Sequence, residues 1–417
     1  MAHWIHHRKI DASAKLKILL LNQAFYPDVV STAQHLSELA TELAARGHQV
    51  TVVTGRRAYD QPEKLFPAQE TWRGIQIFRI FSTRFGKKAK WRRAADFASF
   101  IFLCCAKLTF LRRHDVVVAL TTPPLISFIG AWRAKLWRAD FVYWVMDMNP
   151  DEAIAAGWLR EDSFVGKMLE RMSRFSLRRA NWIIALDRFM RLRIMSKGIV
   201  PEKITVLPPW SQDNDVHFDA VGREQFRKAH GLHDKFVVMY SGNHSPVHPL
   251  GTLMQAAERF QGDRSIAFCF IGGGSEFKHV QRWMEAGKRA NVLCLPYQPL
   301  NQLAASLSAA DAHVVVMGDA MLGLVHPCKI YNILAVGAPV IYIGPTPSHV
   351  TEILDCLGGK HPWVCMRHGE VAALSSGIQN LKQRTMNDGR FISEKAPAAF
   401  SKGVLLPQMI AGLEKLA

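Results

Sequence analysis

Residues 236–274 read FVVMYSGNHSPVHPLGTLMQAAERFQGDRSIAFCFIGGG, and this stretch decides the fold class. Two short apolar runs, 236–240 and 267–271, enclose a segment with helical spacing near 250–260. A strand, a helix and a second strand in succession form a βαβ unit, whose parallel sheet must be covered on both faces. The stretch therefore predicts an α/β protein built on a doubly wound parallel sheet.

The alternation of apolar strands and helical segments continues through the rest of the chain. We expect further strands at 292–295, 312–317 and 339–343 in the second half, and at 16–21, 49–54, 75–80, 116–120 and 141–146 in the first. The neighbouring prolines Pro208 and Pro209 exclude both a helix and a central strand. Two α/β domains joined there would place their ligands beyond the carboxyl ends of the strands, in a cleft between the sheets.

Domain boundaries follow from these elements. Residues 1–15 are polar and basic and lack the apolar core of a signal peptide, so we expect a flexible N-terminal tail. Residues 16–209 are predicted to form the first Rossmann-like domain and residues 210–395 the second. Residues 396–417 are predicted to form a C-terminal helix that can cross back to the first domain.

Composition indicates the class and the compartment. The chain has 417 residues, 49% hydrophobic and 21% charged, which is typical of a folded protein and excludes a disordered one. Its 7 cysteines are scattered singly, apart from Cys104 and Cys105, with no CxxC motif and no metal-like Cys/His spacing. We therefore expect buried thiols in a reducing, cytoplasmic compartment.

Positive charge is concentrated in the first half. Residues 1–210 hold 33 Lys and Arg against 18 Asp and Glu, whereas residues 211–417 hold 19 against 17. The net charge of +17 is thus +15 in the first half and +2 in the second. This asymmetry favours an anionic partner, such as a lipid headgroup surface, over a general solubility effect. No nucleic-acid-binding module is recognisable, so nucleic acid is not expected.

One apolar segment, residues 97–111, lies between basic flanks. Because a bilayer span needs about 20 apolar residues, this segment is too short to cross a membrane. It can be a core helix that covers the first sheet, which we favour, or a helix lying in the membrane interface. In either case we expect peripheral contact with an anionic membrane surface through Lys87, Lys88, Lys90, Arg92, Arg93, Arg112 and Arg113.

An ordered series of motifs runs through the second half: YSGNH at 240–244, FIGGG at 270–274, LPY at 295–297, AAD at 309–311, KIYN at 329–332 and AVGAPV at 335–340. The first half agrees, with Tyr26-Pro27, ARGH at 45–48 and KITVLP at 203–208. Together these motifs resemble the family 4 glycosyltransferases of GT-B fold, and within them the branch that builds bacterial surface polysaccharides and antigens.

The resemblance implies a UDP- or GDP-linked sugar held by the second domain and a saccharide or lipid-linked acceptor held mainly by the first. It also implies anomeric retention and no metal ion. No strand ends in a convincing DxD motif, so fixed positive groups and backbone N–H donors are expected to stabilise the leaving diphosphate. The candidate donor-binding residues are Gly242, Asn243, His244, His248, Gly272, Gly273, Gly274, Tyr297, Lys329, Ile330 and Asn332.

Lys329 is the sharpest of these candidates. It precedes an apolar helical run, so its charge would add to the free N–H groups at a helix N-terminus. Two glycine-containing loops, expected at 242–243 and 272–274, either bring backbone close to phosphate or are simply tight turns. His244 and His248 lie where family members often place a phosphate-binding Arg or Lys.

The sequence departs from the family at its best-known signature, a pair of glutamates eight positions apart. Leu324 and Asn332 occupy the two positions. Asn332 can still hydrogen-bond ribose hydroxyls, but a leucine cannot replace a carboxylate. Asp319, His326 or the backbone of residues 323–325 are the candidates for contacting the sugar.

Many family members carry a histidine after the strand expected at 141–146, where this chain has Asp147. A carboxylate at a strand end can orient the acceptor hydroxyl or take its proton, so Asp147 is the predicted catalytic group. Asp151 and Glu152 are expected to cap the following helix. An inverting reaction with Asp147 as base stays open because the retaining constellation is incomplete.

Two alternatives stay open beside a glycosyltransferase of surface-polysaccharide or glycoconjugate biosynthesis at the cytoplasmic membrane face. A nucleotide-sugar 2-epimerase shares the architecture, but it needs neither a separate acceptor nor a basic first domain. A degenerate protein that binds nucleotide or lipid without catalysis would explain the missing glutamates.

Overall fold

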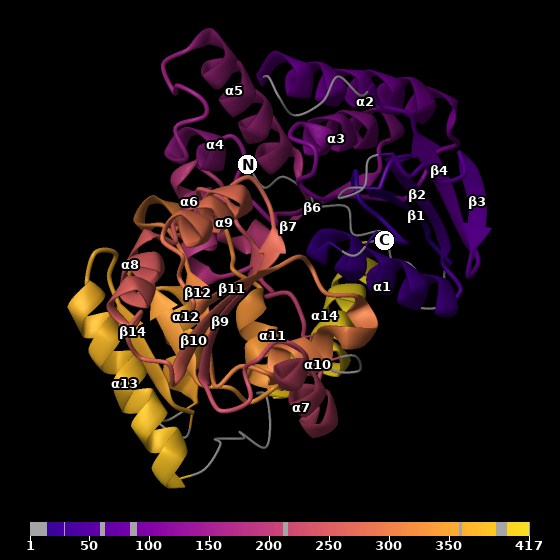
Figure 1. The fold of residues 1–417 in the computed structure, drawn as a ribbon. Helices are drawn as coiled ribbons and strands as arrows, with labels where there is room; N and C mark the ends of the chain where they lie inside the picture. Colours follow the sequence, from indigo (N-terminus) through magenta and orange to yellow (C-terminus); the bar gives the residue numbers. More distant parts are fainter. Residues whose placement is uncertain are drawn as a thin grey trace. The chain divides into compact units, whose positions relative to one another are not determined.

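The computed structural model describes residues 15–28, 30–58, 63–83, 90–211, 216–357, 361–388 and 398–416, without the side chains of residues 90–95, 386–388 and 398. The chain divides into two compact units (Figure 1). Unit 1 comprises Met1–Pro208 and Leu406–Ala417, and unit 2 comprises Pro209–Leu405. The basic residues Lys87 and Lys88 lie outside the described residues.

Unit 1 contains an eight-stranded sheet in the order β3-β4-β2-β1-β5-β6-β7-β8. Neighbouring strands are parallel, except that β3 runs antiparallel to β4 at the edge. The strands are β1 (Lys17–Leu21), β2 (Gln49–Gly55), β3 (Gln69–Trp72), β4 (Ile75–Ile80), β5 (Val116–Ala119), β6 (Asp140–Trp144), β7 (Trp182–Ala185) and β8 (Ile204–Val206).

Helices cover this sheet because their apolar residues recur at helical spacing. In α1, for example, Leu36, Leu39 and Leu43 are fully buried. The helices of unit 1 are α1 (Ser31–Ala45), α2 (Lys90–Phe110), α3 (Ile126–Trp137), α4 (Asp151–Ala155), α5 (Phe164–Arg179) and α6 (Arg188–Ser196). The last helix, α14 (Lys402–Glu414), belongs to unit 1 from Leu406 onward.

Helix α2 contains the apolar segment of residues 97–111. Phe100, Cys104 and Leu108 form a buried stripe, as a core helix requires. On its other side, Phe102 and Phe110 are 72% and 86% exposed. The segment is therefore a core helix along one face and presents apolar side chains to solvent on another. None of the helices in the described residues combines the length and apolar character needed to span a bilayer.

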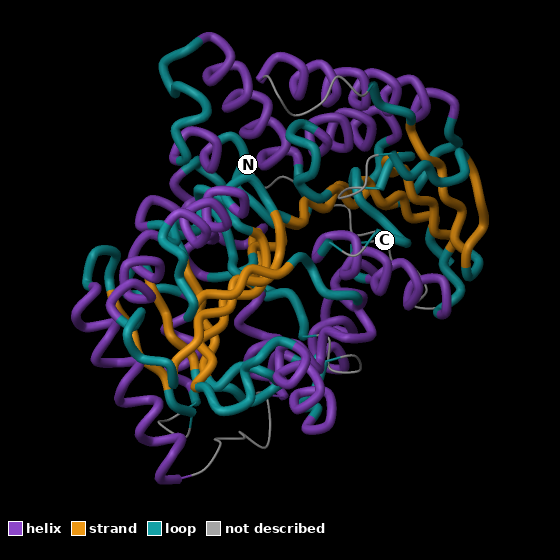
Figure 2. The backbone as a smooth tube through the Cα atoms, viewed as in Figure 1, coloured by secondary structure: helices purple, strands orange, loops and turns teal. Residues whose placement is uncertain are grey.

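Unit 2 contains a six-stranded, fully parallel sheet in the order β11-β10-β9-β12-β13-β14. Figure 2 shows these strands flanked by helices. The strands are β9 (Phe236–Asn243), β10 (Ile266–Gly273), β11 (Val292–Leu295), β12 (Ala312–Val316), β13 (Val340–Ile343) and β14 (Trp363–Met366). The helices are α7 (Ala220–Ala229), α8 (Gly251–Arg259), α9 (Phe277–Ala286), α10 (Leu303–Ser308), α11 (Lys329–Ala335), α12 (His349–Cys356) and α13 (Val371–Asp388).

Alternate residues of the central strands enter two separate cores. Val238 and Tyr240 of β9 pack with the residues of α8 and α13, whereas Val237 and Met239 pack with Phe226 of α7. A parallel strand buried on both faces reads as a continuous apolar run, which explains the pattern of residues 236–240. The predicted α/β class with two doubly wound, Rossmann-like domains is confirmed.

Candidate functional site

The strand ends of unit 2 hold a buried lysine. Lys329 is the first residue of α11, as predicted. Its Nζ lies 3.5 Å from the ring centroid of Tyr240, a residue of β9 that is fully buried. Within the described residues this Nζ is buried without a hydrogen-bond partner. The aromatic face attracts the ammonium group but leaves its donors unused.

Burial lowers the pKa of Lys329 to about 7. Desolvation disfavours the charged form of a lysine, and a nearby anion has the opposite effect. A diphosphate placed beside Nζ would therefore restore the full positive charge of this side chain. The site has the electrostatics of a cation that lacks its counter-ion.

Two histidines lie close enough to Lys329 for its charge to act on them. Nδ1 of His244 lies 3.0 Å from the carbonyl oxygen of Gly242, and Nδ1 of His248 lies 2.8 Å from that of Val316. A carbonyl only accepts, so both rings carry a proton on Nδ1. Burial, with a further contribution from Lys329, lowers the pKa of His244 to about 4 and that of His248 to about 3.

These tautomers change the predicted role of the histidines. A neutral ring with its proton on Nδ1 presents Nε2 as an acceptor, and Nε2 of His244 is buried without a partner in the described structure. His244 and His248 donate to a phosphate oxygen from Nε2 only after taking up a second proton. A bound anion that stabilises the charged form of Lys329 would also favour the second proton on His244 and His248.

The two glycine segments differ from the loops expected at 242–243 and 272–274. Strands β9 and β10 continue through them, and Gly272 pairs with Gly242 and Gly273 with Asn243. Gly242 and Gly272 have φ values of +136° and +139°, and a side chain at Gly272 would collide with the carbonyl oxygen of Gly242. Glycine is required here so that two backbones meet beside Lys329, whose Nζ lies 3.3 Å from the position of a Cβ at Gly242.

The remaining donor-site candidates divide into two groups. Tyr297 is half exposed, and its ring lies 2.9 Å from the position of a Cβ on Gly273, so it covers that glycine. A Cβ on Gly274 would collide with both Oδ1 of Asn243 and the carbonyl oxygen of His244, so this glycine packs closely against them. Ile330, by contrast, has no exposed surface, so its side chain belongs to the core, and the predicted donor contact falls to its backbone N–H in the first turn of α11.

The candidates for the missing glutamates occupy different environments. Leu324 is a buried core residue, whereas Asn332 is half-buried on α11. Nε2 of His326 lies 2.8 Å from Oη of Tyr331, and its ring stacks on His349 at 3.9 Å. Asp319 is exposed in a single 3-10 turn, Asp319–Met321.

In unit 1 the predicted catalytic group, Asp147, follows β6 by three residues. Burial raises the pKa of Asp147 to about 6. Tyr143, on β6 itself, is close enough for the charges of Asp147 and Asp151 to add to the effect of burial, which raises the pKa of its phenol to about 12. Asp147 therefore lies at the carboxyl end of a parallel strand, where ligands of doubly wound sheets bind.

The capping role expected for Asp151 and Glu152 is wrong. Pro150 precedes the first turn of α4, and no side chain caps it. Asp151 instead pairs with the buried Nζ of Lys197 at 2.8 Å, and Glu170 of α5 shares the same Nζ at 2.7 Å. This network joins α4, α5 and α6 and holds the segment that follows Asp147. Sequence reasoning missed Lys197 and Tyr240, because burial of a lysine or a tyrosine has no local signal.

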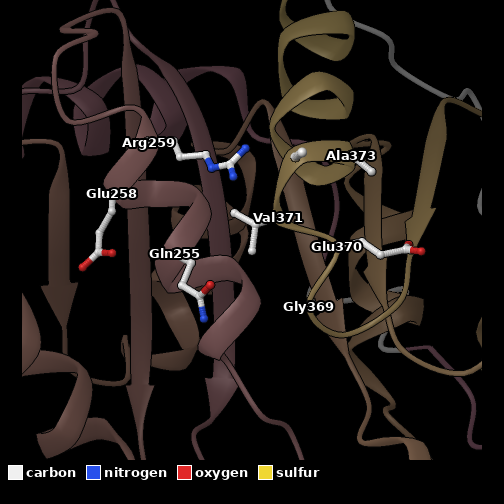
Figure 3. Close-up of a pocket in the computed structure, with 8 residues that line it drawn as sticks. Gln255, Glu258, Arg259, Gly369, Glu370, Val371 and Ala373 are labelled. Atoms are coloured by element: carbon white, nitrogen blue, oxygen red, sulfur yellow. The ribbon is translucent and has the colours of Figure 1, made fainter.

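A surface groove in unit 2 lies apart from these residues. It has a volume of about 740 Å³, lies between α8 and the start of α13, and is lined by Gln255, Glu258, Arg259 and residues 369–373 (Figure 3). None of the predicted site residues lines this groove. It is therefore no part of the candidate site.

Known proteins resemble this chain over both units. The family model described as "Glycosyl transferase 4-like domain" matches residues 32–210, and "Glycosyl transferases group 1" matches residues 222–355. A protein of Escherichia coli (strain K12) named as a colanic acid biosynthesis glycosyl transferase, WcaI, is 24% identical over 87% of this chain and 91% of its own. The protein named glycosyltransferase WbjE of Pseudomonas aeruginosa is 26% identical over 65% and 67%.

Solved structures share the fold. HepE of Anabaena, in complex with UDP-glucose, superposes with a TM-score of 0.71 at 17% identity over 95% of this chain and 99% of its own. Sucrose-phosphate synthase from Thermosynechococcus elongatus gives a TM-score of 0.73 at 14% identity over 96% and 99%. The two family models and the two parallel-sheet units agree: the chain belongs to the family 4-like glycosyltransferases of GT-B fold.

Proposed function

We propose that this glycosyltransferase moves a sugar from a nucleotide diphosphate to a saccharide or lipid-linked acceptor in the synthesis of a surface polysaccharide. The proposed donor is supported by the UDP-glucose complex of HepE, and the proposed pathway by the name of WcaI. A nucleotide-sugar 2-epimerase is not favoured, because the family models and the named relatives are glycosyltransferases.

One observation carries the donor assignment: the buried Nζ of Lys329, next to His244 and His248, without a counter-ion in the described residues. A departing nucleoside diphosphate is an anion that needs fixed positive charge where its own charge develops. The glycine backbones of Gly242 and Gly272 let the phosphates approach closely. Because a bound diphosphate would restore the charge of Lys329 and favour protonation of the two histidines, we propose leaving-group stabilisation without a metal ion.

The reaction breaks the bond between the anomeric carbon and the donor phosphate oxygen and forms a bond from that carbon to the acceptor oxygen. We propose retention of configuration, in which the departing diphosphate accepts the proton of the acceptor hydroxyl. Asp147, in its ionised form, then positions the acceptor by accepting a hydrogen bond from a second hydroxyl of the same acceptor. Inversion would instead make Asp147 the proton acceptor, and the anomeric configuration of the product distinguishes the two.

A thermal-shift screen against nucleotides and nucleotide sugars tests the donor assignment. A ligand that binds the folded state raises the apparent stability, by about 2.7 kcal/mol at a hundred times its Kd. We expect a nucleoside diphosphate or its sugar to raise Tm in the native chain and in Lys278→Ala, an exposed lysine of α9, but much less in Lys329→Ala. No shift with any nucleotide, measured with titration calorimetry as a second method, would overturn the proposal.

Peripheral binding at the inner face of the cell membrane is the proposed location. Phe102 and Phe110 project from α2 into solvent, and Arg112 and Arg113, just beyond its end, are exposed. Each basic residue near an anionic bilayer contributes about 1 kcal/mol, screened over about 8–10 Å at physiological salt. These groups together would give reversible, salt-sensitive adsorption.

Sedimentation with lipid vesicles tests this location. We expect the chain to bind vesicles that contain phosphatidylserine at low salt, to leave them as salt rises, and to ignore phosphatidylcholine vesicles. Replacing Phe102 and Phe110 with serine should weaken binding, whereas Val221→Ser, an exposed apolar residue of α7, should not. Absence of binding to anionic vesicles at low salt would contradict the proposed location.

A further inference from the structure

Unit 1 contains a cavity of about 70 Å³ at the carboxyl ends of β5 and β6. Thr121, just beyond β5, and Tyr143, on β6, line it together with residues of α3 and α5. Asn149, two residues after Asp147, also lines it. The cavity therefore lies where the acceptor is expected, and none of the predicted site residues uses it.

One of the residues that line the cavity has a buried, unsatisfied hydroxyl. Thr121 is 4% exposed, and its hydroxyl has no hydrogen-bond partner among the described residues. The neighbouring hydroxyls differ, because Ser127 donates to Ser176 at 3.3 Å and Ser176 donates to the carbonyl oxygen of Met172 at 3.1 Å. A buried hydroxyl without a partner destabilises the fold, so a bound group that supplies the missing bond would be favoured.

Size and lining restrict what can fill the cavity. An engineered cavity of about 150 Å³ holds the six heavy atoms of benzene, so about 70 Å³ has room for roughly three. The rest of the lining is mainly apolar and includes Phe128, Leu169 and Met172, which are half-buried. These partly exposed walls indicate that the cavity reaches the surface between α3 and α5.

We infer that this cavity binds the acetyl group of an acetamido sugar at the end of the acceptor. An acetyl group has three heavy atoms, of which one accepts a hydrogen bond and one is a methyl carbon. The hydroxyl of Thr121 would donate to the acetyl oxygen, and the methyl group would contact Phe128 and Leu169. This inference rests on the proposed function, in which unit 1 holds the acceptor. A lipid chain would need a much longer apolar channel than three atoms fill.

A binding experiment on the full chain tests the inference without requiring transfer. The chain, saturated with the nucleoside diphosphate found in the donor screen, is titrated with methyl glycosides that carry either an acetamido or a hydroxyl group at carbon 2, in gluco and galacto configurations. The methyl NMR signals of Thr121 and Met172 report on the cavity. We expect the acetamido glycoside of at least one configuration to shift both signals and to bind about tenfold more tightly or better, since a site that hydrogen-bonds one group rejects its analogue.

Two variants on one helix, α4, give a matched comparison. Ala153 lines the cavity and Ala155 does not, and both are half-buried. Ala153→Leu adds three carbon atoms to the cavity wall and should remove the preference for the acetamido glycoside, whereas Ala155→Leu should keep it. Thr121→Val removes the unpaired hydroxyl with little change of shape. It should lower the preference severalfold without lowering Tm.

The outcomes separate the cavity from the donor site. If acetamido and hydroxyl glycosides bind equally, or neither shifts the signals of Thr121 and Met172, the inference is overturned. A preference that survives Ala153→Leu also overturns it, because the acetyl group then binds elsewhere. Nucleoside diphosphate binding is measured separately on the same sample. Its loss would refute the proposed function, and its presence without an acetamido preference would refute only the cavity assignment.

Discussion

The strand ends of the two units offer opposite chemistry on the same architecture. In unit 2, burial lowers the pKa of Lys329 to about 7, and in unit 1, burial raises the pKa of Asp147 to about 6. Both shifts favour the neutral form, because the dry end of a parallel sheet disfavours either charge. The site of Lys329 in unit 2 thus favours binding of an anion. Asp147 in unit 1 can accept a hydrogen bond or a proton near neutral pH.

The two sites also differ in their neighbours. Lys197 of unit 1 is buried but pairs with Asp151 and Glu170, so its charge is compensated within the fold. Among the described residues, Nζ of Lys329 lies on the face of Tyr240 without a hydrogen-bond partner, and the two histidines on which its charge acts are neutral. A compensated lysine stabilises structure, whereas an uncompensated one is typical of a binding site. Variants of these residues, changes of pH and removal of metal test this contrast.

The largest effect is expected for Asp147→Asn. The amide keeps the shape of the side chain but removes the negative charge. The rate should fall by about 10²-fold if Asp147 positions the acceptor, and by up to about 10⁴-fold if it takes the proton. Steady-state transfer assays should show this loss, while nucleotide binding in unit 2 stays unchanged. Asp162→Asn, an exposed residue ahead of α5, is the control. Activity within a few-fold of the native chain would remove Asp147 from the reaction.

Lys329→Ala should weaken nucleoside diphosphate binding by about 1.5–3 kcal/mol, the scale of a hydrogen bond to a charged group. Binding of the free nucleoside should hardly change, and titration calorimetry measures both. Equal losses for the two ligands would show that Lys329 does not contact the phosphates.

The same position tests whether the uncompensated charge destabilises the empty protein. Lys329→Met keeps most of the apolar stem and removes the desolvated ammonium group, so Tm without ligand should rise. Lys197→Met should have the opposite effect, because it leaves Asp151 and Glu170 without their shared cation. Calorimetry of both variants measures Tm. A fall in Tm for Lys329→Met would show that the charge of Lys329 does not destabilise the empty protein.

The pH dependence of transfer should reflect the ionisation of both Asp147 and Lys329. Transfer should rise as pH passes about 6, where Asp147 loses its proton, and kcat/KM should fall above about 7, where Lys329 of the free enzyme loses its own. The fall is at most tenfold per pH unit for one proton. Lys329→Arg should flatten the alkaline limb, because arginine keeps its charge across this range. An alkaline limb that persists in this variant would assign it to another group.

The stability of the ligand-free protein should rise with pH in the range where kcat/KM falls. The folded pKa of Lys329 lies below the unfolded value of about 10.4, so the unfolded chain binds more protons between about pH 7 and 10. The contribution of this residue to the free energy of unfolding therefore rises with pH through that window. Comparing the native chain with Lys329→Met in denaturant titrations at several pH values isolates this term.

The smallest effect is expected from metal removal. If Lys329 and protonated His244 and His248 neutralise the diphosphate, transfer should survive excess EDTA with less than a twofold change. Measuring initial rates before and after chelation, with magnesium and manganese added back, checks this. Complete loss that either metal restores would refute leaving-group stabilisation by protein groups alone.

The fold class and most elements of the sheets were predictable from the sequence. The apolar runs at 236–240 and 292–295 became strands because a buried parallel strand needs a continuous apolar run. Lys329 was predictable as the start of a helix, because an apolar helical run follows it directly. The apolar segment of residues 97–111 favoured a core helix in the same way, and α2 buries Phe100, Cys104 and Leu108. These signals are local, since spacing along a few turns decides them.

Other features needed the tertiary structure. The glycine segments at 242–243 and 272–274 looked like loops, but backbone pairing between two strands extended both of them. The capping role of Asp151 was wrong because Lys197, the residue that follows α6, pairs with its carboxylate.

What the sequence by itself determined was which residue types follow which strands: a lysine before α11, two histidines after β9, and an aspartate after β6. Only the tertiary structure decided their chemistry, because a pKa and a missing hydrogen-bond partner depend on neighbours that are distant along the chain. Tyr240 lies beneath Lys329, and residues of α5 line the same cavity as Thr121. Burial is a property of packed elements together, and the free energy of desolvation follows from it.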